Sequence, residues 1–314
     1  MQSQTTPEAS TESRPDSIRL VPNPWPLMRT GHRWLARMKH REAQVDQHRM
    51  VWLERGQPGP GRPTVVLLHG FASMKENWSA WLPLLPRHWH LLVPDLPGFG
   101  ESDYRAGADY RFETQARRLA DWLVQVDCCD NLHLVGSSMG GAIATVLAHS
   151  LEPQATSLTV LNSAGIPIRP DLDLAIPPKT EPSLLVPESW RGVYQMFNNV
   201  GDGKPTLMGL AMTGLLGIDL MRRARGHRKI FADMMADPYA PVRHLAGSKL
   251  PLQVQWGDRD VITPTRCVDY YRTQLPHAQI QIFRGVGHVP MLETPRRSAQ
   301  ALTHFINSHC LQPG

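Results

Sequence analysis

The sequence has no long apolar run, and this absence limits the classes of protein that it can encode. A membrane-spanning helix needs about 18 or more consecutive apolar residues, and no stretch of the 314 residues approaches that length. Residues 1–24 are polar and rich in proline, so they lack the apolar stretch of a secretory signal peptide. The sequence therefore predicts neither an integral membrane protein nor a secreted one.

Cysteine is scarce, and its spacing fits neither disulfides nor metal binding. The chain has Cys128, Cys129, Cys267 and Cys310. The adjacent pair does not have the spacing of metal ligands, and four such residues do not make a disulfide framework. We expect reduced thiols in a cytoplasmic protein and no metal site.

The excess of basic residues is small and concentrated in one segment. The formal net charge is +5, and a run without any acidic residue accounts for all of it, at Arg29, Arg33, Arg37, Lys39 and Arg41. The rest of the chain is close to neutral, which argues against a nucleic-acid partner.

The same basic segment has two interpretations. Residues 25–41 mix apolar and basic side chains at partly helical spacing. Such a segment is typical of peripheral contact with an anionic membrane surface, but a helix packed on the flank of the domain would show the same pattern. The localisation that we expect is cytoplasmic, with peripheral membrane attachment as the open alternative.

Strand and helix patterns alternate along two parts of the chain. Continuous apolar runs, typical of strands buried in a parallel sheet, cover residues 64–68, 91–93, 132–135, 158–161 and 252–256, and an alternating strand pattern covers residues 279–283. Strand-like pieces at 43–45 and 49–54 predict an opening hairpin. Helices are predicted at residues 77–85, 113–126, 142–149, 266–274 and 294–307. This alternation predicts an α/β fold with a parallel sheet.

The alternation stops at Ile166 and resumes at Pro251. A connection of this length is too long for a bare loop, and it contains proline clusters followed by segments rich in Met, Leu and Gly. We predict a disordered tail at 1–24, the basic segment at 25–42, a core at 43–166 and 251–309, and a helical cap at 167–250. The methionines of the insertion suit a flexible cap over a pocket, although they could equally fill the insertion's own core.

The motif that carries the chemistry is a Gly-x-Ser-x-Gly pattern from Gly136 to Gly140. It follows a short apolar run and precedes a helix-forming segment, which is the context of a nucleophile elbow. Ser138 has glycine two residues before and after it, where a side chain would collide with the tight backbone. Ser137 has Val135 and Met139 at those positions, so only Ser138 fits.

A serine nucleophile needs a general base, and the base needs an acid to orient it. Candidates follow later strands in the order Ser, Asp, His: Ser138, then Asp258 or Asp260, then His288. The carboxyl ends of parallel strands share one edge of a sheet, where ligands bind. Asp95 follows a different strand, where neighbouring prolines and glycines indicate a structural turn.

The oxyanion of an acyl-transfer reaction needs backbone N–H donors. Met139 directly follows the nucleophile and can supply one, and Phe71, after His69 and Gly70, can supply the other. His69 is interpreted as a structural hydrogen-bonding residue, with a second base as the alternative.

Together these stretches resemble the α/β-hydrolase superfamily from about residue 43 to 307. Residues 69–78, 136–141 and 162–165 are similar to the monoacylglycerol-lipase-like branch and to related bacterial esterases and lipases. The resemblance implies a mostly parallel sheet flanked by helices with a helical cap, and it implies ester hydrolysis without a cofactor. It also implies a triad of Ser138, Asp260 and His288, because the family's acid is third after the glycine, with Phe71 and Met139 as oxyanion donors.

Three functions remain in competition. The first is hydrolysis of acylglycerols or similar apolar esters. The second is carbon–carbon bond hydrolysis of dienone-type ring-cleavage products, and the third is a non-catalytic binding protein on the same scaffold. Ser138 argues against dehalogenases and epoxide hydrolases of this fold, which use a carboxylate nucleophile. Acyl-chain preference and oligomeric state are left open.

Overall fold

The structure is a computed structural model that describes residues 38–128, 131–171, 174 and 185–309. The tail predicted at residues 1–24 and most of the basic segment lie outside the described residues, as do Cys129 and Cys310. Among the described residues, no helix is both long and apolar enough to cross a membrane.

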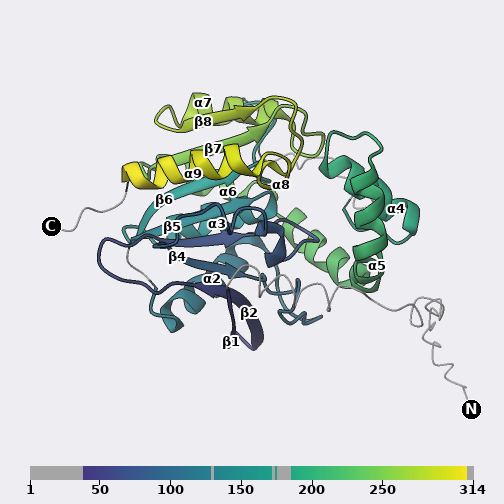
Figure 1. Ribbon diagram of the computed structural model, residues 1–314, viewed down its shortest axis with the longest axis horizontal. Coiled ribbons are helices and arrows are strands. Elements are labelled where there is room, and N and C mark those ends of the chain that lie inside the picture. Colours follow the sequence, from purple (N-terminus) through teal and green to yellow (C-terminus); the bar gives the residue numbers. More distant parts are fainter. Residues whose placement is uncertain (1–37, 129–130, 172–173, 175–184, 310–314) are drawn as a thin grey trace, which may run out of the picture.

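An eight-stranded sheet organises the molecule, in the order β1-β2-β4-β3-β5-β6-β7-β8 (Figure 1). The first two pairs in this order, β1 with β2 and β2 with β4, are antiparallel, and all later pairs are parallel. The strands are β1 (Lys39–Val45), β2 (His48–Arg55), β3 (Thr64–Leu68), β4 (His90–Pro94), β5 (Leu132–Ser137), β6 (Ala155–Leu161), β7 (Leu252–Gly257) and β8 (Gln279–Phe283). Each apolar run in the sequence forms one of these strands, and the predicted α/β fold class is confirmed.

Helices cover both faces of the sheet. They are α2 (Phe112–Gln125), α3 (Met139–Ser150), α4 (Trp190–Val200), α5 (Leu207–Met235), α6 (Ala240–Leu245), α7 (Val268–Gln274), α8 (Pro290–Glu293) and α9 (Pro295–His309). In β3, Val66 and Leu68 pack into the cluster that holds α2 and α3, whereas Val65 and Leu67 pack into the cluster that holds α9. Successive strand residues point to opposite faces, so an unbroken apolar run is required for a strand that is covered on both sides.

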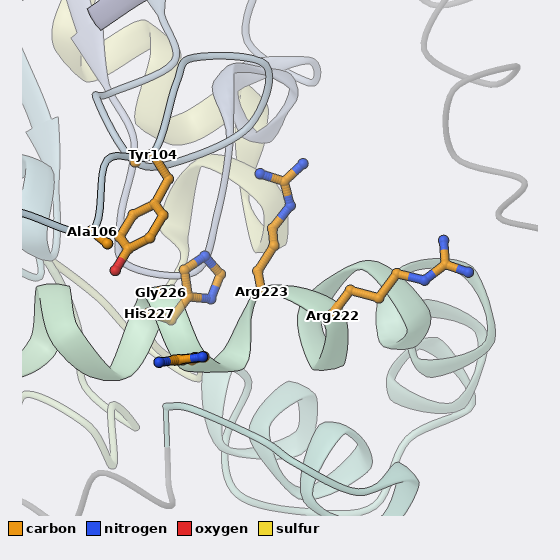
Figure 2. Close-up of a pocket in the computed structure, with 8 residues that line it drawn as sticks. Tyr104, Ala106, Arg222, Arg223, Gly226 and His227 are labelled. Atoms are coloured by element: carbon orange, nitrogen blue, oxygen red, sulfur yellow. The ribbon is translucent and has the colours of Figure 1, made fainter. Parts of the chain in front are cut away.

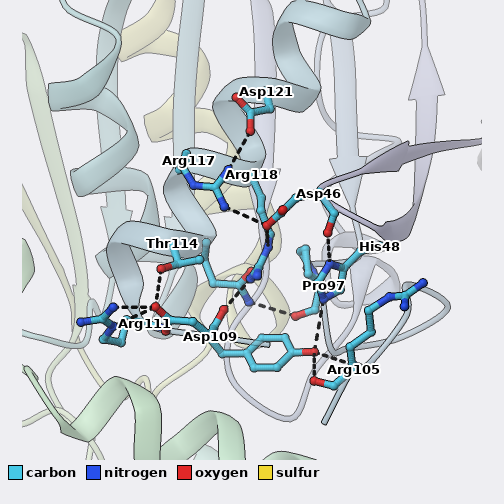
Figure 3. A network of polar contacts seen from close by, with 12 residues as sticks. Asp46, His48, Pro97, Arg105, Asp109, Arg111, Thr114, Arg117, Arg118 and Asp121 are labelled. Carbon is cyan, nitrogen blue, oxygen red and sulfur yellow. Dashed lines mark hydrogen bonds and ion pairs between the residues drawn. The ribbon is translucent and has the colours of Figure 1, made fainter. Parts of the chain in front are cut away.

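The opening hairpin is fixed to the core through its turn (Figure 3). Asp46 has a positive φ at this turn, and its carboxylate accepts hydrogen bonds of 2.8 Å from both Arg117 and Arg118 on α2. The bond from Arg118 is the main cause that lowers the pKa of Asp46. Strand β1 begins at Lys39, so the last residues of the basic segment are extended and not helical as its spacing suggested.

The prediction of a helix at residues 77–85 is wrong. Only a short 3-10 helix, η2 (Lys75–Trp78), forms there, and turns follow it. Pro83 has no N–H to donate and would clash within a continuing helix. The apolar spacing that favoured a helix still has a physical role, because Trp78, Trp81 and Leu82 are completely buried against α9.

The segment between β6 and β7 contains α4, α5 and α6. Ser189 and Thr206 cap the first two helices, since their side chains accept hydrogen bonds from backbone N–H groups three residues later. Figure 1 shows α4 and α5 together at one end of the sheet. Helix α6 instead packs against α3 and α2, and its apolar residues join the main core.

Candidate active site

Ser138 occupies a strained turn between β5 and α3. Its φ of 53° and ψ of −120° lie in a region that a residue with a side chain rarely adopts. Two hydrogen bonds hold this backbone against the next strand: the Ser138 N–H donates to Leu161 O at 2.9 Å, and the Ala164 N–H donates to Ser138 O at 3.0 Å. The turn has the strand-to-helix geometry of a nucleophile elbow.

Glycines make this turn sterically feasible. A Cβ atom at Gly136 would lie 2.1 Å from Gly140 O, and one at Gly140 would lie 2.2 Å from Leu68 O. Both distances are far shorter than any real contact. The structure therefore gives a physical reason for glycine on both sides of Ser138. A Cβ atom added at Gly70 would also lie close to the serine, 3.3 Å from the Ser138 Cβ atom.

Asp260 and His288 form a buried pair at the same edge of the sheet. Asp260 follows β7 and His288 follows β8, and His288 Nδ1 lies 2.7 Å from Asp260 Oδ2. Their side chains are only 0% and 6% exposed. An aspartate that accepts from Nδ1–H leaves Nε2 as the free base. The structure therefore brings Asp260 and His288 into contact. Within the described part of the chain, the Ser138 side chain makes no hydrogen bond with the His288 ring, and Ser138 follows β5, two strands from β7 and three from β8.

Four further donors from three residues hold the Asp260 carboxylate. Oδ1 accepts the N–H groups of Ile262 and Thr263, at 2.8 and 3.0 Å. Oδ2 accepts the Thr263 hydroxyl at 2.6 Å and the Asn162 side-chain amide. Burial alone raises the pKa of Asp260, but the charge and hydrogen bond of His288 and the bonds from Thr263 and Asn162 outweigh it, and the net shift is downward. The acid is therefore ionised at neutral pH.

Asn162 and Thr263 are site residues for which sequence reasoning assigned no role. Asn162 follows β6 with a φ of +47°, its Oδ1 accepts the Gly257 N–H at 3.2 Å, and its amide donates to Asp260. Asn162 thus joins the end of β6 to residues 257–260, the loop that carries Asp260. A signal existed, because Asn162 stands at a strand end on this edge and asparagine tolerates a positive φ.

The competing carboxylates lie elsewhere. Asp258 is exposed and accepts the Gly285 N–H at 2.7 Å, so it links two loops and does not contact His288. Asp95 is completely buried, pairs with the Lys75 ammonium, and accepts the N–H groups of Lys75 and Glu101 at 2.7 and 2.8 Å. Asp95 organises a turn, in agreement with its proline and glycine neighbours.

His69 is bonded to the backbone at both ring nitrogens. Its Nε2 accepts the Leu96 N–H at 3.0 Å, which leaves Nδ1 to donate to Gly70 O at 2.8 Å. Burial is the main cause that lowers its pKa, so the ring is neutral. These bonds fix the loop that carries Phe71. Among the described residues, the N–H groups of Phe71 and Met139 have no intramolecular acceptor, so both are free to bind an oxyanion.

The inserted helices contact the histidine loop directly. The His288 N–H donates to Val200 O, the last residue of α4, at 3.0 Å. A Cβ atom at Gly287 would lie 2.0 Å from Gly201 O, so glycine is needed where the two backbones meet. Next to this contact, Arg259 lies 3.6 Å from Asp202. The turn between α4 and α5 therefore contacts both the loop that carries Asp260, through Arg259, and the loop that carries His288.

Within the part of the chain that the structure describes, this edge holds no cluster of metal ligands. Among residues 38–128, 131–171, 174 and 185–309, no group of three or more His, Cys, Asp or Glu side chains could hold a metal ion. Cys128 and Cys267 are buried, and burial is the main cause that raises the pKa of Cys267 to about 12. A thiol with this pKa is not a nucleophile at neutral pH.

Comparison with known proteins identifies the class. The pattern of the alpha/beta hydrolase family matches residues 65–301, and the chain belongs to this family. Lipase 1 of Psychrobacter immobilis is 32% identical over 82% of this chain and 80% of its own. The monoacylglycerol lipase ABHD6 of Bos taurus is 24% identical over 86% and 83%. A solved structure titled as a membrane phospholipase A and bacterial virulence factor superposes with a TM-score of 0.78, at 29% identity and 90% coverage of both chains.

These relatives narrow the class further. The similarity extends over most of each chain, and the relatives are lipases. The protein is a carboxylic ester hydrolase of the lipase-like branch, as the sequence motifs predicted.

Proposed function

We propose that the protein hydrolyses acylglycerols or similar apolar esters through an acyl-enzyme on Ser138. The observation that carries this proposal is the position of Ser138 in a strained elbow, at the sheet edge that also holds the buried Asp260–His288 pair. The lipases among its relatives support the apolar ester as substrate.

The proposed reaction has two stages. Ser138 Oγ attacks the ester carbonyl while His288 Nε2 takes its proton, and the Phe71 and Met139 N–H groups stabilise the oxyanion. The C–O bond to the alcohol then breaks, and His288 returns the proton to the leaving alkoxide. In the second stage, His288 removes a proton from water, the hydroxide attacks the acyl carbon, and the free acid leaves as Ser138 recovers its proton. Asp260 stabilises the imidazolium in both stages.

Hydrolysis of a glycerol-ester series with acyl groups from two to eighteen carbons tests this proposal. We expect a medium- or long-chain optimum that disappears in Ser138→Ala. The matched control is Ser137→Ala, which changes the neighbouring buried serine and keeps activity. Activity that persists in Ser138→Ala would disprove the nucleophile. Absence of ester turnover in the folded wild type, with turnover of a chromogenic dienone, would instead identify a carbon–carbon bond hydrolase.

We also propose that α4 and α5 form a cap over the site. The support is their position beside the sheet edge and the bond from His288 to Val200. Helix α5 exposes Leu207, Met208 and Leu210, which are 87%, 70% and 60% exposed. Substitution of these three residues by Ser should reduce turnover of long-chain esters more than of short-chain esters. An equal reduction for long-chain and short-chain esters would show that these residues do not bind the acyl chain.

Peripheral membrane contact through residues 25–41 is proposed on two grounds. The segment is basic without an acidic residue, and a structural relative is titled a membrane phospholipase. Substitution of Arg29, Arg33 and Arg37 by Gln should reduce co-sedimentation with anionic vesicles and leave hydrolysis of a water-soluble ester unchanged. Undiminished sedimentation would rule this segment out.

A further inference from the structure

A cavity lies between α5 and the loop that follows β4 (Figure 2). Its volume is about 400 Å³. It is lined by Tyr104, Ala106, Arg222, Arg223, Arg225 and His227, together with Gly98 and Gly226. Figure 2 shows Tyr104 facing His227, while Arg223 extends from α5 on the same side. This volume is within the range of small-molecule sites.

The lining of this cavity is positive. Three of its residues are arginines, and none is acidic. Asp219, one turn earlier on α5, accepts a hydrogen bond of 2.8 Å from Arg223 and offsets part of the charge. Arg225 has no acidic partner within the described part of the chain. A cavity with this charge favours an anion.

His227 provides an independent indication of a ligand. The residue is only 3% exposed, yet among the described residues neither of its ring nitrogens has a hydrogen-bond partner. Leaving a buried polar group unpaired is costly. Burial is the main cause that lowers its pKa to about 3, so the ring is neutral and offers one N–H donor to whatever occupies the cavity.

We propose that this cavity is a phosphate-binding site, in which Arg223 and Arg225 hold the phosphate oxygens and His227 donates one hydrogen bond. A phosphate group carries enough oxygens to accept from several guanidinium groups at once, and arginine suits this planar, bidentate recognition. The phosphate can belong to the head group of an acyl-ester substrate or to a free anion. Both share the same chemistry, and the experiment below separates them.

The site is close to the proposed oxyanion loop. The His227 ring stacks on Phe99 at a centroid distance of 5.2 Å and meets the edge of Phe71 at 5.7 Å. Phe71 carries one of the proposed oxyanion N–H donors, and His227, which lines the cavity, contacts its ring. A phosphate that orders His227 therefore also orders the residue beside the reaction centre. This connection to catalysis rests on the proposed ester hydrolysis, whereas the binding itself does not.

Binding is measured first, by titration calorimetry with inorganic phosphate and with glycerol 3-phosphate. Removal of one arginine contact should weaken binding roughly tenfold in Arg225→Gln, and His227→Phe should weaken it while keeping the ring packing. The matched control is Arg228→Gln, which removes the same charge from the same helix, outside the cavity, where Arg228 pairs with Glu188. Thermal melting confirms that each variant is folded. If neither compound binds the wild type, or if Arg228→Gln weakens binding as much as Arg225→Gln, the proposal is overturned.

Kinetics then identify the source of the phosphate. The substrates are a monoacylglycerol and the same compound with a phosphate on its glycerol. A head-group site predicts that Arg225→Gln raises KM roughly tenfold for the phosphorylated ester only. A free-anion site predicts equal KM changes for both esters, together with weaker phosphate binding. Because calorimetry detects binding without turnover, loss of the proposed hydrolase activity and loss of this site give different results.

Discussion

Asp260 and Asp95 are two buried carboxylates at the carboxyl ends of parallel strands, and they differ in the partner that each one faces. Asp260 faces the imidazole of His288, which can take up and release a proton. Asp95 faces the ammonium of Lys75, whose side chain is completely buried and also lies 2.6 Å from Glu101. The two aspartates flank the Ser138 strand on opposite sides of the sheet order.

Both aspartates are buried at the sheet edge, so burial and position alone do not distinguish the proposed catalytic acid from a structural carboxylate. Asp95 holds η2 to the loop after β4, since it bonds the backbone of Lys75 and of Glu101. A Cβ atom at Gly100 would lie 2.1 Å from its carboxyl carbon, so the loop is closed around it. Asp260 has an equally fixed carboxylate, but its partner is a titratable base. We therefore expect one residue to govern the rate and the other to govern stability.

The largest effect is expected for Asp260→Asn. The substitution keeps the size of the side chain but removes the charge that stabilises the imidazolium and fixes its tautomer. We expect kcat/KM for an ester to fall about 10⁴-fold, while the melting temperature changes little. Asp258→Asn is the matched control and should keep near wild-type activity. Equal losses in both variants would contradict the assignment of the acid.

The second prediction concerns the structural pair. Lys75→Met leaves the buried Asp95 without its cation, and breaking a buried ion pair in this way costs about 3–5 kcal/mol of unfolding free energy. Urea unfolding measures this loss, and kcat of the protein that remains folded should stay near that of the wild type. Lys249→Met, at an exposed lysine, should cost less than about 0.5 kcal/mol. A loss of kcat without a loss of stability would reverse the roles of the two aspartates.

A smaller effect is expected for Thr263→Val, which removes one hydroxyl from Asp260. A hydrogen bond to a charged group contributes about 1.5–3 kcal/mol, and the two backbone N–H donors and Asn162 remain. We expect kcat to fall roughly tenfold with little change in KM, because the threonine acts by positioning the acid. Thr263→Ser keeps the hydroxyl and should restore most of the rate. A serine variant as slow as the valine variant would show that packing, and not the hydroxyl, is responsible.

The smallest effect concerns acid pH. The pKa of Asp260 is lowered in the folded protein, because the interactions with His288, Thr263 and Asn162 outweigh the burial that raises it. Its contribution to stability is therefore fully present above the unfolded pKa of about 4 and is lost as pH falls through the lower folded pKa. The unfolding free energy of wild type minus that of Asp260→Asn should shrink as the pH falls below about 4. A difference that grows below about pH 4 would contradict the lowered pKa of Asp260.

The sequence predicts well what depends on local pattern. Unbroken apolar runs become strands because both faces of the sheet are covered, and Ser138 is singled out by glycines that its backbone contacts require. The failed helix at residues 77–85 shows the limit, since its apolar side chains are buried although Pro83 does not allow the helix to continue. Contacts between residues far apart in the sequence could not be predicted from the local pattern. Asn162 contacts Asp260 98 residues away, and the unpaired ring of His227 follows only from how α5 packs against Phe71 and Phe99.

The hydrogen bond from the His288 N–H to Val200 O has a consequence for how such a chain can be recombined. The insertion supplies a backbone acceptor to the base loop, and Gly201 meets Gly287 where no Cβ atom fits. A chimaera that receives its insertion from another hydrolase therefore needs a compatible junction at residues 200–203. Without it, the graft would alter the position of His288 even though every residue of the proposed triad is retained.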